Sequence, residues 1–278
     1  MSIPSSMNVG PFTTTVLVKK KYLGFYIGLM WISITAITLE FWIYWQYLWN
    51  SNSKILFFIF LPLLIFLMYI TIVIVSLFFA KVMLIILNFL HKPREGIFLR
   101  DKSDRDYRFW SLRNVIKKWP IWLSHKFPFP FLDNICFKVF GVKTKFSNSL
   151  FEGWVDCEFI EFGKGVIIGK SSIIQSSLIV GNYLIIKKTI IGDNAHIGAH
   201  TVVMPGTHIG KNCILAASSA TTVDQDLEPN WIYIGLPAKK YRKNPFFEEN
   251  LENKITHVID TDALQAEIFK TYEKGKHN

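Results

Sequence analysis

The sequence is short of charged residues, of acids in particular, and of cysteine. Only 19% of its 278 residues are charged, whereas half are hydrophobic and 15% are aromatic. Soluble globular domains are usually about 25% charged, so this composition excludes a disordered polar chain and argues against a wholly soluble protein. The three cysteines, Cys136, Cys157 and Cys213, have no Cys-x-x-Cys spacing, which argues against a disulfide framework and a cysteine zinc site. Lysine and arginine exceed the acids, 31 to 21, giving a net charge of +10.

Two long hydrophobic runs occupy residues 22–49 and 55–90. A helix needs about 20 apolar residues to cross the roughly 30 Å hydrocarbon core of a bilayer, and both runs are long enough. Only a short polar loop separates them, so we expect a two-helix transmembrane hairpin over residues 22–90, with Pro62 kinking the second helix. The first run is too long and too aromatic for a cleaved signal peptide, which favours an uncleaved anchor.

Basic residues flank the two runs unevenly. The flanks carry Lys19, Lys20, Lys21, His91, Lys92, Arg94 and Arg100, and the loop carries only Lys54. The positive-inside rule therefore predicts a two-pass integral membrane protein. Its N-terminal tail (residues 1–21), its C-terminus and the β-helix described below would be cytoplasmic. Glu40, an acid inside a predicted span, is a functional candidate, although nearby tryptophans resemble an interfacial belt that would place it in a wet environment.

Residues 91–148 form what we call the collar, a segment rich in basic and aromatic residues. Fourteen basic and five acidic residues lie between Lys81 and Lys145, interleaved with Phe and Trp. Such a mixture beside a transmembrane helix is typical of an amphipathic segment that lies on an anionic lipid surface. Nucleic acid is the competing partner for basic and aromatic residues, but no recognition motif is present, so we expect none. The proline-containing run at residues 127–131 predicts a break in any helix.

The stretch that starts at Ile167 repeats with a period of six residues. Nine successive units begin with an aliphatic residue, and all but one have a small residue at the fifth position. The first positions are Ile167, Ile173, Ile179, Ile185, Ile191, Ile197, Val203, Ile209 and Leu215. This period fits neither an α-helix nor a lone amphipathic strand and is the signature of a parallel β-helix. Three sides close a coil of roughly 18 residues, so we expect Ile173, Ile191 and Ile209 to stack in the interior, after an irregular coil over residues 150–166.

The run IGDNAHIGAHTVVMPGTHIGKNCILAASSATTVDQD, followed by YIGLPAKKYRK, resembles the C-terminal half of left-handed β-helix hexapeptide acyltransferases. The resemblance implies an all-β left-handed parallel β-helix over residues 149–243, attached to the N-terminal hairpin and collar. It also implies a homotrimer that binds acyl-CoA in the grooves between neighbouring β-helices. The hairpin, the collar and the segment Glu152–Asp156 also resemble the membrane-embedded terminal region of polylysine-synthetase-like non-ribosomal peptide synthetases.

The resemblance implies that a histidine acts as general base, for which an ordinary pKa of about 6.5 is well suited. Three histidines, His196, His200 and His208, fall at positions of the repeat that should point outward. His196 lies in a Gly-Asp-Asn-Ala-His-Ile-Gly context that resembles the histidine near the acyl group in sugar-amine N-acetyltransferases of this fold. We therefore expect His196 to be catalytic, with His200 second. The sequence departs from that subgroup nine residues earlier, where Lys187 replaces the family's base.

The donor implied by the resemblance is acetyl-CoA or another acyl-CoA. The residues expected to bind it are Gly198, Ala217, Gly235, Pro237, Ala238, Lys239 and Lys240. Of these, Lys239 and Lys240 carry the charge needed to pair with phosphates, although they would also fit a solvated tail.

The expected function is that of a membrane-anchored acyltransferase with an amine or hydroxyl acceptor, and no metal. Two alternatives remain open. One is a zinc enzyme similar to γ-class carbonic anhydrases, which share this fold, although the histidine separations of four and eight residues differ from that family's. The other is a non-catalytic trimeric membrane scaffold. Residues 244–278 are expected to form a C-terminal helical tail without chemistry of its own.

Overall fold

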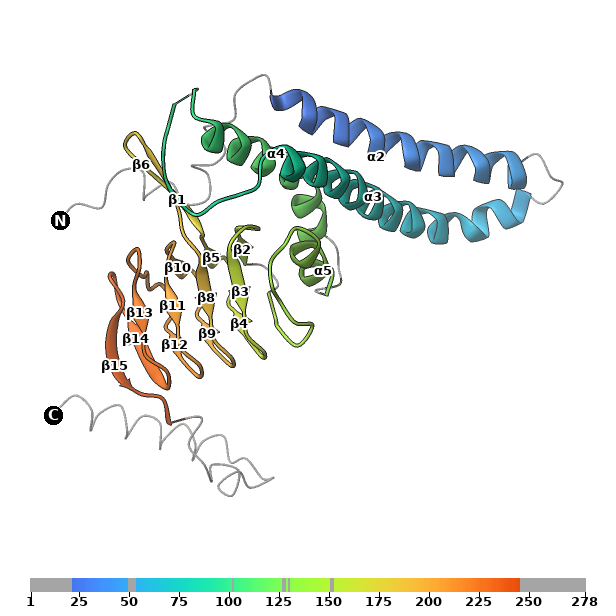
Figure 1. Cartoon of the computed structure of the whole chain (residues 1–278). Helices are drawn as coiled ribbons and strands as arrows, with labels where there is room; N and C mark the ends of the chain where they lie inside the picture. Colours follow the sequence, from blue (N-terminus) through green and yellow to red (C-terminus); the bar gives the residue numbers. More distant parts are fainter. Residues whose placement is uncertain are drawn as a thin grey trace, which may run out of the picture.

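The computed structural model describes residues 22–49, 54–101, 103–126, 129, 131–150 and 153–245. The predicted N-terminal tail with its three lysines, Glu152, and nearly all of the predicted C-terminal tail lie outside these residues. Figure 1 shows a pair of long helices that extends away from a stack of short strands, with two shorter helices between them.

The two long helices form a hairpin. Helix α2 (Leu23–Tyr44) ends in a short π-helical turn, η3 (Trp45–Trp49), and helix α3 (Lys54–Leu90) returns beside it (Figure 1). Both helices are long and apolar enough to cross a membrane, with mean hydropathies of 1.5 and 2.9 over their apolar windows. Only 11% of each window is buried within the chain, unlike the core helix of a soluble protein. Pro62 lies inside α3, which continues through it over all 37 residues.

The collar folds into two helices that fill the space between α3 and the strands. Helix α4 (Arg105–His125) begins with Asp104, whose side chain accepts a hydrogen bond from the Tyr107 backbone N–H as an N-cap, and it packs against α2 and α3. Helix α5 (Phe131–Val139) follows after the proline-containing run. The expectation that this segment lies on lipid is wrong for several of its members, because Trp110, Arg113, Lys117 and Trp119 are buried against the rest of the chain.

The strands form a three-sided prism of stacked coils, so the predicted parallel β-helix is confirmed. The first side contains β2 (Trp154–Val155), β5 (Ile173–Ile174) and β10 (Val202–Val203). The second contains β3 (Ile160–Phe162), β8 (Thr189–Ile191), β11 (His208–Ile209) and β13 (Asp226–Leu227). The third contains β4 (Ile167–Ile168), β9 (His196–Ile197), β12 (Ile214–Leu215), β14 (Trp231–Ile234) and β15 (Lys239–Lys243). All neighbours in these sheets are parallel except β14 and β15.

Three columns of apolar side chains fill the prism. The strand registers place one inward residue of each strand above that of the next, and all of these residues are buried. The columns are Val155–Ile174–Val203, Phe162–Ile191–Ile209–Leu227 and Ile168–Ile197–Leu215–Tyr233. Burying an aliphatic side chain contributes about 1.5 to 3 kcal/mol, so these columns are the main source of stability for the prism.

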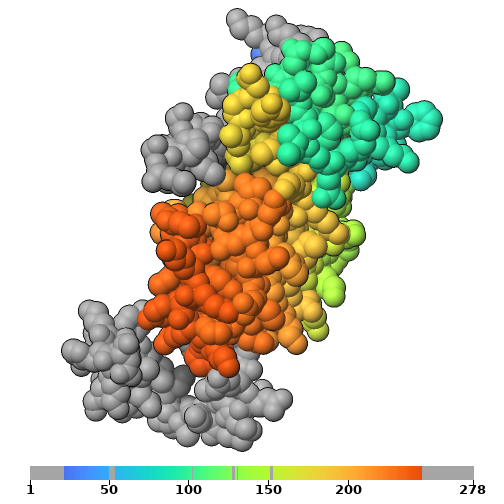
Figure 2. Space-filling model, turned by 60° about the vertical axis from the view of Figure 1, so that its left-hand side comes forward, coloured from blue at the N-terminus to red at the C-terminus, as the bar shows by residue number. Residues whose placement is uncertain are grey.

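A hairpin interrupts the repeat and corrects the predicted register. Strands β6 (Ser177–Val180) and β7 (Tyr183–Ile186) form an antiparallel hairpin that leaves the prism, and β1 (Gly96–Leu99) pairs with β7. In Figure 2 this hairpin lies beside the green segment that contains β1. Ile179 and Ile185 therefore belong to the hairpin and not to the coils.

The inward-pointing position of the repeat is also different in the coils that precede the hairpin. Ile191 pairs in register with Ile209, 18 residues later, but with Phe162, 29 residues earlier. Ahead of the hairpin the inward residues are Ile168 and Ile174, and Ile167 is 46% exposed. The predicted stacking of Ile173 over Ile191 is thus wrong. A strand alternates with a period of two, so a hairpin can carry aliphatic residues six apart without belonging to the coils.

Candidate active site

Residues in the left-handed region of backbone conformation form the corners of the prism. One corner stacks Asn194, Asn212 and Asn230, whose φ angles are 53°, 54° and 63°. Asparagine tolerates this conformation better than most residues. The Asn194 amide donates to Asn212 Oδ1 at 3.3 Å, and the Asn212 amide donates to Asn230 Oδ1 at 2.9 Å. This ladder holds the corner that leads directly into β9 and therefore fixes the backbone that carries His196.

His196 is the first residue of β9, in the middle of the third side of the prism. Its strand lies between β4 and β12, where it faces Ile167 and Ile214 in register. The side chain is exposed, as predicted from its position in the repeat. No side-chain hydrogen bond or ion pair within the described part of the chain orients its imidazole.

His200 and His208 lie elsewhere on the prism. His200 sits at a second corner, with φ of 56°, stacked with Ser171 and Ser218 at 57° each. Its backbone N–H donates to the Lys170 carbonyl at 3.0 Å, and its side chain is exposed. His208 is on β11, on the second side, with Nδ1 at 3.6 Å from Asp226 Oδ1. His200 thus lies at the corner that follows the strand of His196, whereas His208 lies on a different side.

This placement bears on the zinc alternative. Among the described residues, no three His, Cys, Asp or Glu side chains group closely enough to hold a metal ion. A site within one protomer made of the three repeat histidines therefore has no support in this structure.

Gly198 and Ala217 meet at the same corner as His200. A Cβ atom on Gly198 would clash with the backbone N of Ala217, so only glycine allows the two turns to approach this closely. The Gly198 N–H donates to the Leu215 carbonyl at 2.7 Å, and the Ser218 N–H donates to the Ala199 carbonyl at 2.9 Å. Ala217 itself is exposed.

The closing Gly-x-Pro-Ala-Lys segment forms the end of the third side. The Gly235 N–H donates to Ser219 Oγ at 3.0 Å, and the Ala238 N–H donates to the Ala220 carbonyl at 2.7 Å. These bonds bury Ala238, whereas Pro237 lies in the exposed turn. The segment then leads into β15, so the sheet that carries His196 near its start carries a strongly basic strand at its end.

The two predicted phosphate-binding lysines differ in their surroundings. Lys240 Nζ lies 2.5 Å from Glu228 Oε2 and 4.2 Å from the centre of the Trp231 ring, so it is already paired. Lys239 is exposed, and an exposed ammonium can reorient toward an anion. Lys187, which stands where the family's base is expected, forms an ion pair with Asp224. This ion pair links two segments of the prism that are 37 residues apart in the sequence, away from His196.

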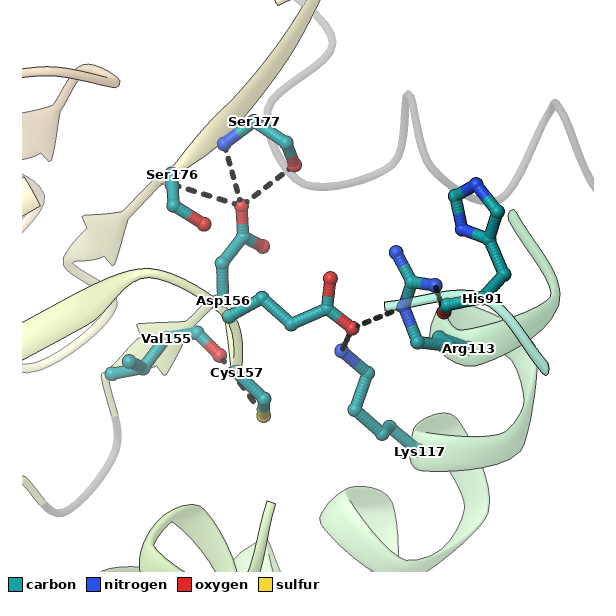
Figure 3. Close-up of polar contacts among 9 residues, drawn as sticks. His91, Arg113, Lys117, Val155, Asp156, Cys157, Ser176 and Ser177 are labelled. Atoms are coloured by element: carbon teal, nitrogen blue, oxygen red, sulfur yellow. Dashed lines mark hydrogen bonds and ion pairs between the residues drawn. The ribbon is translucent and has the colours of Figure 1, made fainter. Parts of the chain in front are cut away.

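A second polar group, at the junction of the collar and the first coil, was missed by sequence reasoning. Glu158 Oε1 accepts hydrogen bonds from Arg113 Nε at 2.8 Å and from Lys117 Nζ at 2.9 Å. Arg113 also donates to the His91 carbonyl (Figure 3). Arg113 and Lys117 are four residues apart, which puts them on one face of α4. That spacing was the available signal, but nothing in the sequence showed that this face would be buried.

Asp156, two residues before Glu158, has a separate set of partners. Its Oδ2 accepts hydrogen bonds from the backbone N–H groups of Ser176 and Ser177 at 3.1 and 3.2 Å, and from Ser177 Oγ at 2.9 Å (Figure 3). These bonds attach the first coil to the start of the β6–β7 hairpin. Burial raises the pKa of Asp156 even though the two serines stabilise its charged form.

The charges around Glu158 and Cys157 act in opposite directions. Burial alone would raise the pKa of Glu158, but the charges and hydrogen bonds of Lys117 and Arg113 outweigh it and hold that pKa below its usual value. Burial raises the pKa of the Cys157 thiol to about 12. A protonated buried thiol is a poor nucleophile, so Cys157 is a packing residue, consistent with the free state of all three cysteines.

Residues 188–221 match the family model described as bacterial transferase hexapeptide (six repeats), which confirms the predicted resemblance to hexapeptide-repeat transferases over this segment. No curated protein matches the chain. The further resemblance to the terminal region of polylysine-synthetase-like enzymes stays a prediction.

Three solved structures are similar to part of this chain. A hexapeptide-repeat-containing acetyltransferase from Vibrio cholerae is 19% identical, with a TM-score of 0.35, and the match covers 44% of this chain and 84% of that one. A maltose O-acetyltransferase from Clostridium difficile is 17% identical, with a TM-score of 0.36 and coverages of 46% and 83%. A galactoside acetyltransferase in complex with coenzyme A is 19% identical, with a TM-score of 0.37 and coverages of 54% and 85%.

Proposed function

We propose that this protein is a membrane-anchored acyltransferase that moves an acyl group, acetyl in the first instance, from a CoA thioester to an amine or hydroxyl acceptor. The observation that carries the proposal is the third side of the prism. Two of its strands, β9 and β12, lie in the segment that matches the transferase hexapeptide model; it presents the exposed imidazole of His196 and ends in the basic strand β15.

His196 is the proposed general base. A neutral imidazole there would take the proton from the acceptor's amine or hydroxyl as that group attacks the thioester carbonyl, and would then pass it to the departing CoA sulfur. His200, at the adjacent corner, is the second candidate for this role. Backbone N–H groups at the turns are suited to stabilise the oxyanion that forms.

The residues along this side are compatible with an acyl-CoA. Gly198 allows the two coils to approach closely at Ala217, whose exposed side would face the acyl-CoA, and Gly235 and Pro237 shape the turn before β15. Lys239 is available to a phosphate, with Lys240 and its Glu228 partner beside it. Phosphate contacts from lysine are charge-assisted and therefore among the stronger hydrogen bonds in proteins.

The proposal includes a left-handed coil, a homotrimer and a membrane anchor. Two outer sides from neighbouring protomers would form the groove in which His196 and the acyl-CoA meet. Helices α2 and α3 would cross the bilayer with both chain ends in the cytoplasm, as the positive-inside rule predicts. The supporting observation is that both helices expose their apolar residues rather than bury them in the chain.

Binding of acetyl-CoA to the detergent-solubilised protein, measured by calorimetry, tests the donor. We expect binding that weakens about tenfold in Lys239→Glu, because a charge contact of this kind contributes about 1.4 kcal/mol or more. The matched control is Lys211→Glu, an exposed lysine on another corner, which should bind normally. No acetyl-CoA binding by the unaltered protein would overturn the acyltransferase proposal and favour a scaffold.

Release of free CoA thiol from acetyl-CoA, with and without added small amines, tests the base. Loss of a general base costs about 10²- to 10⁴-fold, so we expect His196→Ala to lose turnover while retaining acetyl-CoA binding. His200→Ala and His208→Ala provide comparisons on the adjacent corner and on another side. Full turnover in both His196→Ala and His200→Ala would overturn the assignment. Stoichiometric zinc in the purified protein would favour the anhydrase alternative.

A further inference from the structure

A cavity of about 370 Å³ lies where α3, α4 and the first coil of the prism meet. None of the three repeat histidines lines it, so it is separate from the proposed acyl-transfer site. Its walls are apolar on the α3 side, with Leu84 and Ile85, and on the coil side, with Phe159 and Ile160. The volume lies within the range of small-molecule sites, which begins at about 300 Å³.

Positive charge predominates around this cavity. Its lining includes five basic and three acidic side chains: Lys81, Arg113, Lys117, Lys143, Lys188, Glu95, Glu158 and Glu161. The acids compensate only part of this charge. Lys143 and Lys188 share Glu161, and Arg113 and Lys117 share Glu158. Lys81 Nζ donates to the Val139 carbonyl at 2.6 Å, which engages one of the three donors of its ammonium group. The balance favours an anionic ligand.

Two residues that line the cavity each have a buried acceptor with no donor within the described part of the chain. These acceptors are Asn88 Oδ1, on α3, and Glu158 Oε2, the carboxylate oxygen opposite the one that Arg113 and Lys117 contact. A buried polar atom without a partner costs about 1 to 3 kcal/mol. Both atoms are shielded from solvent in this arrangement, so a ligand that carries hydroxyl groups would remove this cost by donating to them once the two side chains turn toward the cavity. The cavity therefore favours a ligand with an anionic part and a hydroxyl-bearing part.

The cavity lies at a depth that suits a lipid headgroup. From Lys54, where α3 begins, to Lys81, at the cavity, the helix rises about 40 Å. A bilayer is about 30 Å thick in its hydrocarbon core and about 40 to 45 Å with its headgroups. If α3 crosses the membrane as proposed above, Lys81 reaches the cytoplasmic headgroup layer. The outer surface of α3 continues from the cavity as exposed apolar side chains, including Phe78 and Ile85, which can contact acyl chains.

We propose that this cavity binds the headgroup of an anionic phospholipid that carries hydroxyl groups, of which phosphatidylglycerol is the probe. The basic side chains bind the phosphate, and Asn88 and Glu158 accept hydrogen bonds from the headgroup hydroxyls. The inference rests on the proposed membrane placement of α3 but not on acyl transfer. Because the same residues join α4 to the first coil, a bound lipid would fix the prism relative to the membrane.

Native mass spectrometry of the detergent-solubilised protein can test this with three lipids that have identical acyl chains. Phosphatidylglycerol and phosphatidylmethanol carry the same charge, but only the first has free headgroup hydroxyls, and phosphatidylcholine has no net charge. We expect phosphatidylglycerol to bind at least several-fold more tightly than phosphatidylmethanol, and phosphatidylmethanol more tightly than phosphatidylcholine. Equal binding of all three would overturn the proposal.

Two variants separate the charge from the hydroxyl contribution. Lys188→Gln, at a side chain that is 37% exposed, should weaken both anionic lipids by a similar factor, whereas Lys211→Gln, away from the cavity, should not. Asn88→Leu should reduce binding of phosphatidylglycerol toward that of phosphatidylmethanol and leave the latter unchanged. Unaltered lipid preference in both cavity variants would show that the lipids bind elsewhere and would overturn the site.

Two further measurements distinguish the causes of failure. Soluble glycerol phosphate should not compete with the lipid at millimolar concentration, because it lacks the chains that contact α3; effective competition would make the ligand a free polyol phosphate and overturn the lipid assignment. Acetyl-CoA binding should be unchanged in Lys188→Gln and Asn88→Leu. A protein that stays monodisperse without detergent would instead refute the membrane placement itself.

Discussion

Two regions of the molecule differ in how they accommodate buried polar groups. One is the set of regular coils that follows the β6–β7 hairpin, and the other is the junction between α4 and the first coil. In the coils from Thr189 onward, the inward positions are aliphatic or small apart from Tyr233, and one corner is linked by asparagine hydrogen bonds. At the junction, Arg113, Lys117, Asp156 and Glu158 are brought together out of bulk water. Within the described residues, every buried side-chain polar atom that lacks a partner belongs to a residue before Ile160.

The regular coils therefore satisfy their own buried polar groups, whereas the junction leaves some of its buried polar groups without a partner. Stacked coils repeat the same few contacts, so each layer satisfies the next. The junction joins a helical pair to the end of that stack, and its unpartnered acceptors make it the place where a ligand or a neighbouring chain would contribute most. The regular coils thus supply the rigid surface for the proposed acyl transfer, whereas the junction is where the proposed lipid would bind.

The largest expected effect is at the junction. Glu158→Leu leaves Arg113 and Lys117 buried without their shared counter-ion, so we expect the free energy of unfolding to fall by about 3 to 5 kcal/mol. Chemical denaturation of the detergent-solubilised protein measures it.

The matched control for this change is the triple variant Arg113→Met, Lys117→Met, Glu158→Leu. Replacing a whole buried ionic group by apolar residues is often close to neutral, so this variant should recover much of the stability lost in Glu158→Leu. If the single and the triple variant are equally unstable, the ionic contacts are not what holds α4 to the first coil.

The next effect compares two isoleucines that occupy the same position of the six-residue repeat. Ile209 is fully buried in a column, so Ile209→Ala should cost about 2 to 5 kcal/mol. Ile185 lies partly exposed in the hairpin, so Ile185→Ala should cost about 1 kcal/mol or less. Thermal unfolding of the two variants checks this.

A second pair tests the corrected register in the same way. Ile168 is 4% exposed and Ile167 is 46% exposed, so alanine should be much more costly at Ile168. A greater loss of stability in Ile167→Ala than in Ile168→Ala would instead support the predicted register, in which Ile167 points inward.

The regular coils could be predicted from the sequence because their structure is set by local repetition. The aliphatic residues from Ile191 to Leu215 recur every six residues in both sequence and structure, and the outward positions of His196 and His208 follow from the same pattern. The hairpin could not be separated from the coils in this way, because Ile179 and Ile185 keep the six-residue spacing. They leave the prism because β6 and β7 pair with each other as an antiparallel hairpin, to which β1, some 90 residues away, adds a third strand.

The junction was beyond prediction for a related reason. Arg113 and Lys117 are typical of a solvated or lipid-facing helix, and only contact with Glu158, more than 40 residues later, makes them interior residues. The repeat predicted the outward positions of His196 and His200, and the structure places Gly198, Ala217 and His200 at the corner that follows the strand of His196. Their roles in acyl transfer depend on a groove between protomers, which a single chain does not contain, so these assignments stay predictions.

The smallest expected effect is a pH dependence at the mouth of the cavity. Glu161 accepts hydrogen bonds from Lys143 and Lys188 (the second with Nζ at 3.0 Å), and these bonds hold the pKa of its carboxyl below the usual value of 4.5. A carboxyl with a lowered pKa in the folded state stabilises the fold above its unfolded pKa, and this contribution is lost as the pH falls through the folded pKa. The difference in unfolding midpoint between the unaltered protein and Glu161→Gln should therefore be constant from pH 7 to about 5 and shrink below that. A difference that grows toward acid pH would mean that Lys143 and Lys188 do not stabilise the charged carboxyl, and that the charge around the cavity is less well compensated than the structure indicates.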